Sequence, residues 1–312
     1  MVAWNPGDLR APMLRVSIAI PGGDGMDSFD GKVGVVTGAA SGIGRALAAG
    51  LAAEGMRLVL ADVEASALDA AVEQFRSAGH TVEGVVADVS DRAQVEAVAA
   101  VAIDRFGALH FAANNAGVAI GGPAWELTEA DWQWVLGVDL WGVIHGVSVF
   151  TPLIIEAGGG HIVNTASMAG LTSTPFMAPY NVAKHGVVTL SETLALELAM
   201  LAPTVGVTVV CPGWVKTGIN RSERNRRDDG AAADAEPAAD GAVAGGIDLR
   251  STIDGLIATG LDPDDVAAQV IDAVHTRRFS MLTHAGWSSL VTRRAERLVS
   301  GDQPELVLPA ND

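Results

Sequence analysis

Two scarce side chains stand four positions apart in the stretch APYNVAKHG, residues 178–186. Tyr180 is the chain's 1 tyrosine, and lysine occurs elsewhere only at Lys32 and Lys216. On a helix, positions four apart lie on one face, so Lys184 would lie beside Tyr180. A free phenol has a pKa of about 10, and a nearby ammonium favours the phenolate. We therefore expect a lowered pKa for Tyr180; the alternative is an ordinary packed tyrosine.

A glycine-rich stretch, VVTGAASGIGRALA, could hold a phosphate group. It follows a β-branched run and opens a helical stretch, with Gly38, Gly42 and Gly44 in a G-x3-G-x-G spacing. Glycine permits positive φ and lets the backbone approach a pyrophosphate, which the helix N-terminus attracts. The strand–turn–helix context predicts a dinucleotide site.

The acidic residue after the next β-branched run favours NAD over NADP. Asp62 ends the run RLVLAD, where a carboxylate can accept hydrogen bonds from both adenosine ribose hydroxyls and repel a 2′-phosphate. Val63 follows it instead of an arginine, and Ala40 and Ser41 bring no base into the glycine loop.

Seven short apolar runs alternate with helical stretches and would position these residues. Such a pattern indicates an α/β fold, a doubly wound parallel sheet with helices on both faces. The predicted strands are residues 32–38, 57–62, 81–88, 108–117, 160–167, 207–213 and 280–284. The predicted helices are residues 43–54, 64–78, 91–106, 129–157, 180–201 and 263–276.

The chain is interpreted as one domain, residues 26–312, with two segments outside the pattern. Residues 1–25 show no helical or strand period and are interpreted as a flexible extension. A low-complexity insertion at 221–260 is richest in Ala, Asp and Gly at 228–246, and we interpret it as a mobile flap.

The bulk composition limits the partners. With 20 basic and 37 acidic residues the net charge is −17, which opposes nucleic acid or an anionic membrane as partner. The single cysteine, Cys211, and the lack of a signal peptide or a membrane-spanning apolar run favour the cytoplasm. The histidines show no metal-ligand spacing, so no metal site is expected.

Five motifs together resemble the short-chain dehydrogenase/reductase family: TGAASGIG, NNAG, IVNTAS, YNVAK and PGWVKTG, in that order over about residues 30–285. The resemblance implies that Tyr180 is the acid/base and that Lys184 also holds the nicotinamide ribose. It implies that Ser167 hydrogen-bonds the substrate oxygen. The family's fourth catalytic residue, an Asn, corresponds here to Asp139, a candidate for the proton relay.

The resemblance also implies the contacts of the cofactor. The glycine loop would hold the pyrophosphate, Asp88 and Val89 would meet the adenine, and the PGWVKTG stretch would surround the nicotinamide. The cofactor-binding residues so assigned are Gly38, Ser41, Gly42, Ile43, Gly44, Asp62, Asp88, Val89, Asn115, Tyr180, Lys184, Pro212, Gly213, Val215 and Thr217.

These features predict an NAD-dependent oxidoreductase that interconverts a secondary alcohol and its ketone. The alternatives are an epimerase or dehydratase on the same fold, or a dinucleotide-binding sensor or scaffold with little turnover. Apolar residues beside the motifs suggest an apolar substrate: Leu171, Phe176, Met177, Trp214 and Ile219. Helices 129–157 and 180–201 are apolar on more than one face, which predicts a homodimer or homotetramer.

Overall fold

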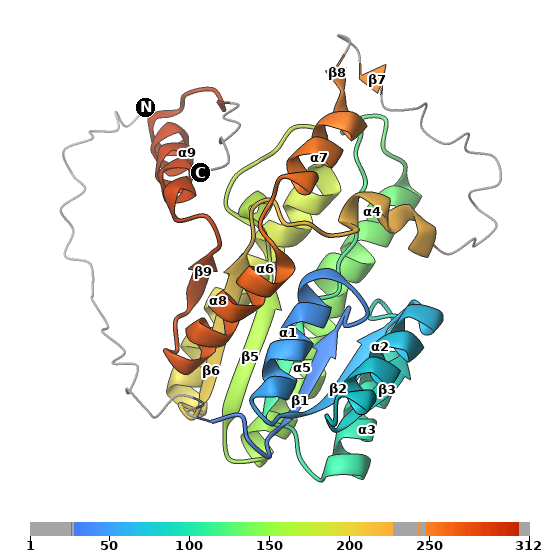
Figure 1. Ribbon diagram of the computed structural model, residues 1–312. Coiled ribbons are helices and arrows are strands. Elements are labelled where there is room, and N and C mark those ends of the chain that lie inside the picture. Colours follow the sequence, from blue (N-terminus) through green and yellow to red (C-terminus); the bar gives the residue numbers. More distant parts are fainter. Residues whose placement is uncertain (1–25, 27, 227–241, 244–246, 306–312) are drawn as a thin grey trace, which may run out of the picture.

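The structure is a computed structural model that describes residues 26, 28–226, 242–243 and 247–305 (Figure 1). The predicted extension 1–25 and nearly all of the segment 228–246 lie outside the described residues. The interpretations of these two segments therefore stay predictions.

A seven-stranded parallel sheet forms the centre of the molecule, as predicted. Its order is β3-β2-β1-β4-β5-β6-β9. Strands β1 to β3 are added toward one edge and β4, β5, β6 and β9 toward the other, so the strand order reverses between the parallel neighbours β1 and β4. In such sheets, ligands bind outside the carboxyl ends of the strands at this reversal. The strands are β1 (Val33–Thr37), β2 (Arg57–Asp62), β3 (Val82–Val86), β4 (Phe111–Asn114), β5 (Gly160–Thr165), β6 (Val205–Cys211) and β9 (Ser280–Leu282).

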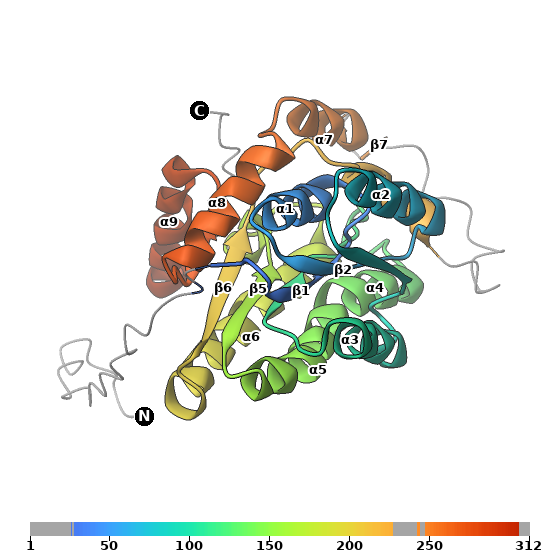
Figure 2. The same ribbon diagram turned by 60° about the horizontal axis from the view of Figure 1, so that its bottom comes forward.

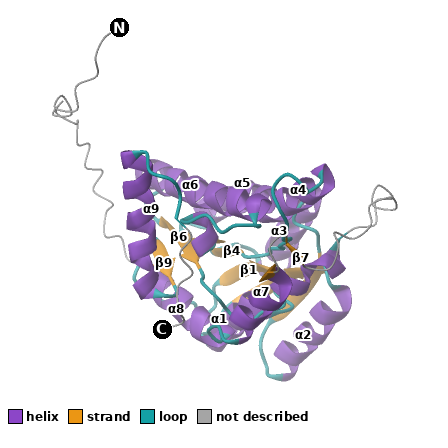
Figure 3. Ribbon diagram, turned by 90° about the horizontal axis from the view of Figure 1, so that it is seen from above, coloured by secondary structure: helices purple, strands orange, loops and turns teal. Residues whose placement is uncertain are grey.

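Helices cover both faces of the sheet, and each layer buries its own apolar core (Figures 2 and 3). The helices on one face are α1 (Gly42–Ala53), α2 (Ala65–Ser77) and α8 (Pro263–His275). Those on the other face are α3 (Arg92–Phe106), α4 (Glu129–Leu136), α5 (Gly142–Glu156) and α6 (Ala178–Leu201). Strands covered on both sides are mostly apolar, and all five residues of β1 are buried.

Several elements differ from the predicted ones. The single predicted helix 129–157 is divided into α4 and α5 by a π-helical turn, Gly137–Trp141. Within the predicted insertion 221–260, the described residues include α7 (Leu249–Ala258) and the end of a 3₁₀ segment, η4 (Ile219–Asn225).

Further elements were not predicted from the sequence. They are the terminal helix α9 (Ser288–Ser300), the short 3₁₀ turns Met168–Gly170 and Ala285–Trp287, and the two-residue strands β7 (Ala242–Val243) and β8 (Ile247–Asp248).

One stretch, Glu129–Glu156, is long and apolar enough to cross a membrane by length and composition alone. Here it forms α4, the π turn and α5, which pack on α3, α6 and the sheet. Two of its acidic residues, Asp131 and Asp139, are buried in polar contacts. A helix layer inside a folded domain accounts for this composition.

Candidate active site

The glycine loop between β1 and α1 has the geometry that a pyrophosphate site requires. Gly38 and Gly42 have φ values of 65° and 53°, which favour glycine. A Cβ at Gly44 would lie 2.2 Å from the Gly38 carbonyl oxygen, so the loop closes tightly on the start of α1. The loop thus fits the phosphates of a dinucleotide, with Gly38, Ser41, Gly42, Ile43 and Gly44 at this turn.

Asp62 lies at the end of β2, directly beside the glycine loop. Its Oδ2 accepts a hydrogen bond from the Ala40 amide at 2.9 Å, and its Oδ1 accepts one from the Glu64 amide at 3.0 Å. The carboxylate is therefore fixed beside the phosphate loop, where the adenosine ribose of a bound dinucleotide is expected. This placement fits NAD.

The predicted adenine contacts follow β3. Asp88 Oδ1 accepts hydrogen bonds from the Ser90 amide at 2.9 Å and the Ser90 hydroxyl at 2.6 Å, which fixes this turn. Val89 is buried, and its carbonyl pairs with His145 Nδ1 at 3.0 Å. The turn therefore presents a fixed wall beside the carboxyl end of β3.

Asn115 connects three strands at their carboxyl ends. Its side-chain amide donates to the Thr37 carbonyl at 3.0 Å, and its carbonyl accepts from the Thr165 hydroxyl at 3.2 Å. The Thr37 hydroxyl accepts the Asn115 and Ala116 amides at 2.9 and 3.1 Å. Thr37 and Thr165 were not predicted as site residues, although both belong to the motifs quoted above.

Helix α6 carries Tyr180 and Lys184, two of the four predicted catalytic residues, and Ser167 follows the end of β5. Lys184 Nζ lies 5.4 Å from the centre of the Tyr180 ring, which confirms that the two share a helix face. Ser167 caps the turn after β5, where its hydroxyl accepts the Ala169 amide at 3.1 Å, and it lies near enough to the Tyr180 phenol to lower its pKa. A hydroxyl, a phenol and an ammonium thus converge in one place.

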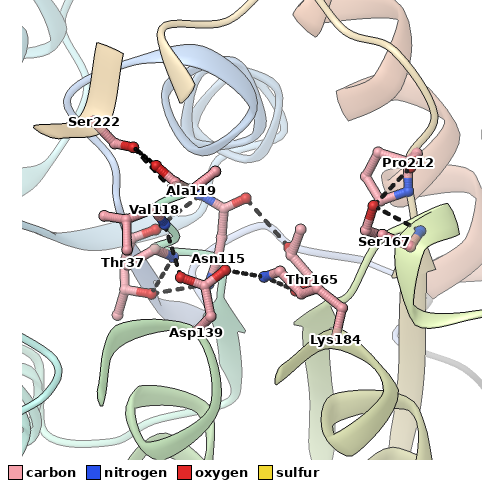
Figure 4. A network of polar contacts seen from close by, with 12 residues as sticks. Thr37, Asn115, Val118, Ala119, Asp139, Thr165, Ser167, Lys184, Pro212 and Ser222 are labelled. Carbon is pink, nitrogen blue, oxygen red and sulfur yellow. Dashed lines mark hydrogen bonds and ion pairs between the residues drawn. The ribbon is translucent and has the colours of Figure 1, made fainter. Parts of the chain in front are cut away.

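Asp139 lies on the other side of Lys184, in the π turn between α4 and α5 (Figure 4). Its Oδ2 is 3.1 Å from Lys184 Nζ, and its Oδ1 accepts the Val118 amide at 2.8 Å. The ammonium also donates to the Thr165 carbonyl at 3.0 Å. Asp139 is therefore part of the constellation through its side chain, in direct contact with the lysine.

The expected low pKa of Tyr180 is wrong for this structure. Burial is the largest cause and raises the pKa of Tyr180, and the Asp139 charge raises it further. The Lys184 charge and the interaction with Ser167 lower it, but the net shift is upward. Burial works against a charged Lys184, but Asp139, Tyr180 and Cys211 together outweigh it, so the pKa of the lysine is raised. The Lys184 ammonium therefore interacts with both the Asp139 carboxylate and the Tyr180 phenol, because all three groups lie close together.

The PGWVKTG stretch follows β6 directly and contacts the catalytic serine. The Pro212 carbonyl accepts the Ser167 hydroxyl at 3.4 Å, and the Thr283 hydroxyl accepts the Gly213 amide at 2.9 Å. Farther along, Val215 forms a β-bridge with Leu261, two residues before α8, and Thr217 lies against the glycine loop. The stretch therefore connects the catalytic serine with the phosphate loop. Thr283 was missed because its sequence neighbourhood carries no motif.

The segment η4 continues this stretch and is anchored to distant parts of the chain. The Ser222 hydroxyl accepts the Ala119 amide at 2.9 Å, and Arg226 pairs with Asp131 of α4 at 2.5 Å. The residues after Gly218 thereby cross the carboxyl edge of the sheet. These anchors were not predicted, because each joins positions about a hundred residues apart.

Comparison with known proteins gives consistent matches. Residues 32–228 match the family model described as short chain dehydrogenase. A short chain dehydrogenase/reductase from Burkholderia phymatum, solved in complex with NAD, is 43% identical with a TM-score of 0.85, covering 91% of this chain and 99% of that chain. The CLA biosynthesis dehydrogenase/reductase of Lactiplantibacillus plantarum is 31% identical over 90% of this chain and 98% of its own length. The cyclohexanol dehydrogenase of Acinetobacter sp. (strain SE19) is 37% identical over 61% of this chain and 76% of its own.

Proposed function

Because the chain belongs to the short-chain dehydrogenase/reductase family, we propose that it is an NAD-dependent oxidoreductase that interconverts a secondary alcohol and its ketone. The observation that carries the proposal is the convergence of Ser167, Tyr180 and Lys184 beside a glycine loop that ends on Asp62. A protein that only binds a dinucleotide has no use for this polar group, which favours the enzyme over the sensor or scaffold.

The three side chains have distinct roles in this proposal. Ser167 donates a hydrogen bond to the substrate oxygen and orients it. Tyr180 moves the proton to or from that oxygen. Lys184 holds a positive charge beside the phenol and disfavours proton uptake by the phenolate. Bound NAD would supply the hydride acceptor, and the reduced form the hydride donor.

The raised pKa of Tyr180 gives the two directions different pH dependences. Near neutral pH the phenol is protonated, so it can give its proton to a ketone oxygen. Oxidation of an alcohol needs the phenolate, which is favoured at higher pH and by the positive charge of the oxidised nicotinamide. We propose that reduction is fastest near neutral pH and that oxidation requires alkaline pH.

The cofactor and substrate follow from the residues at each end of the crevice. Asp62 and the absence of a following arginine favour NAD, and the Burkholderia phymatum structure was solved with NAD. Leu171 and Trp214 are partly buried and pack against the apolar cluster that contains Ala166 and Met168, the neighbours of Ser167, which favours an apolar substrate. A cyclic secondary alcohol is a fitting first test, since one relative is a cyclohexanol dehydrogenase. We propose a cytoplasmic location and a homo-oligomeric state.

A panel of secondary alcohols tests the proposal. The purified chain is incubated with NAD and cyclic or aromatic secondary alcohols, cyclohexanol among them, and NADH absorbance is recorded; the matching ketones are tested with NADH. We expect net NADH formation and at least about tenfold preference for NAD in kcat/KM, about 1.4 kcal/mol. Absence of net NADH with any alcohol would favour the epimerase, dehydratase or sensor instead. Equal use of NADP would contradict the cofactor assignment.

A further inference from the structure

A second carboxylate stands at the adenosine end of the crevice. The Glu64 amide donates to Asp62 Oδ1 at 3.0 Å, so Glu64 lies next to the carboxylate that favours NAD. Its own side chain contacts η4, which follows the PGWVKTG stretch. Glu64 therefore links the position that selects the cofactor with a segment 160 residues away.

The Glu64 carboxylate is occupied by two side chains of η4. Arg224 Nη2 lies 2.5 Å from Glu64 Oε1, and Asn225 Nδ2 donates to the same oxygen at 3.0 Å. The Arg224 hydrogen bond is the main cause of a lowered pKa for Glu64, so the carboxylate stays charged near neutral pH. One side of the guanidinium is thus engaged by a negative charge.

The rest of the guanidinium is held at the same place by the backbone. Arg224 Nη1 donates to the Arg221 carbonyl at 2.6 Å and to the Gly218 carbonyl at 3.3 Å. These two contacts do not involve Glu64, so they would keep Arg224 near this edge if Glu64 lost its charge. A planar guanidinium is well suited to a phosphate, which it binds through two parallel hydrogen bonds.

We propose that Arg224 is a latent ligand for the 2′-phosphate of NADP and that Glu64 withholds it, so that Glu64 acts with Asp62 in selecting NAD. The inference rests on the proposed NAD-dependent function and deepens it. In an NAD-preferring chain, Asp62 repels the extra phosphate, while Glu64 neutralises Arg224, a cation that would attract it. Removal of Asp62 alone would leave Arg224 paired with Glu64.

The test compares dissociation constants of NAD and NADP by calorimetry, because the two differ only in the 2′-phosphate. Asp62→Ser keeps a hydrogen-bond acceptor and removes the repulsion, and Glu64→Gln is then added to it. We expect the ratio of NADP to NAD affinity to rise about tenfold over Asp62→Ser alone, since a charged hydrogen-bonded pair becomes possible. Adding Arg224→Met to the double variant should remove this gain.

Two controls separate this effect from other causes. Glu96→Gln, added to Asp62→Ser, removes a charge that pairs with Arg92 on the exposed side of α3 and should leave the ratio unchanged. The same Glu64→Gln and Glu64→Gln/Arg224→Met variants are measured with Asp62 intact, where a smaller gain of the same sign is expected. Because NAD binding requires the folded protein, measurable NAD affinity in each variant shows that the variant is folded.

The outcomes are distinct. A gain that disappears with Arg224→Met supports the proposal. No gain with Glu64→Gln in either background, or a gain that survives Arg224→Met, overturns it while leaving the proposed function intact. If the unaltered chain bound no NAD, the proposed function would fail, and this inference with it.

Discussion

The carboxylate of Asp139 and the ammonium of Lys184 form a buried ion pair, 3.1 Å apart, with only 0% and 2% of the side chains exposed. The resemblance to the family leads one to expect an uncharged Asn at this position. A carboxylate there adds a negative charge beside the lysine that favours the Tyr180 phenolate. The ion pair therefore opposes phenolate formation, and its removal should be visible in the pH dependence of the reaction.

Asp139→Asn should shift alcohol oxidation to lower pH. Asp139 raises the pKa of Tyr180, so the neutral amide should lower it, and the phenolate should form at a lower pH than in the unaltered chain. The measurement is kcat/KM for oxidation as a function of pH, with ketone reduction as the paired reaction. An unchanged profile would show that Asp139 does not act on the phenol.

The same substitution should destabilise the fold. Breaking a buried ion pair leaves an uncompensated charge and typically costs about 3–5 kcal/mol. The Asn carbonyl can still accept the Val118 amide, so the local turn should survive. Urea unfolding of Asp139→Asn and of Asp139→Asn/Lys184→Met gives the test. The double variant should recover part of the loss, and a single variant as stable as the unaltered chain would show that the pair contributes little.

Tyr180→Phe should separate binding from chemistry. The ring remains and only the proton carrier is lost, so turnover should fall about a hundredfold to ten-thousandfold while NAD affinity stays nearly unchanged. Turnover of the alcohol identified by the panel and calorimetry with NAD provide the two measurements. Ser167→Ala is the companion variant, since it removes the substrate hydrogen bond without removing the acid/base. Appreciable activity in Tyr180→Phe would mean that the tyrosine is an ordinary packed side chain.

The elements nearest the site could be predicted because their signals are local. The run RLVLAD is strand β2 residue for residue, and the glycine loop lies between β1 and α1 as its spacing indicates. The Tyr180–Lys184 spacing likewise predicts its own geometry, because both residues belong to one helix. Strand β6 begins earlier than predicted, at Val205, because that residue pairs with Gly160 of β5.

The features that the sequence did not indicate depend on contacts between distant segments. The π turn at Asp139 interrupts an apolar helical pattern that runs through it without a break. The Ser222 contact with Ala119 spans 103 positions, and the Gly213 contact with Thr283 spans 70. The raised pKa of Tyr180 was missed for the same reason, since its burial, the main cause, and the nearby Asp139 carboxylate both depend on how distant segments pack.

A self-association test follows from the outer face of α5 and α6. An apolar groove of about 430 Å³ lies there, lined by Val147, Ser148, Thr151, Pro152, Ile155 and Leu194. Leu196 and Met200 of α6 are also exposed. Burial of such a surface favours association, so light scattering should give a mass above the 32.0 kDa of one chain.

Ile155→Asp tests whether this groove is the contact. A carboxylate in a buried interface must be desolvated, so the variant should give a smaller species at the same concentration. Val299→Asp on α9 is the control, because it places the same charge on another exposed apolar position. A single-chain mass for the unaltered protein, or an Ile155→Asp variant of unchanged mass, would contradict the prediction.

The buried His161 of β5 should make the folded protein less stable in acid. The imidazole is fully buried, and its Nε2 pairs with the Thr208 hydroxyl at 2.8 Å. That hydroxyl donates to the Arg278 carbonyl, so it accepts from His161, and Nδ1 is left unprotonated without a partner among the described residues. Burial lowers the pKa of His161 from 6.5 to about 3, and the Arg277 charge adds to this.

The sign of the pH effect follows from the two states of His161. Below about pH 6.5 the unfolded chain takes up a proton that the folded chain refuses, so the free energy of unfolding falls as the pH falls toward 3. Between pH 7 and 5 this group should cost about 2 kcal/mol. His161→Gln can still donate to Thr208 but cannot titrate, so urea unfolding should show a smaller loss over this range. His80→Gln, which removes a histidine from the outer end of α2, should behave like the unaltered chain. Equal acid sensitivity in His161→Gln would assign the loss to other groups.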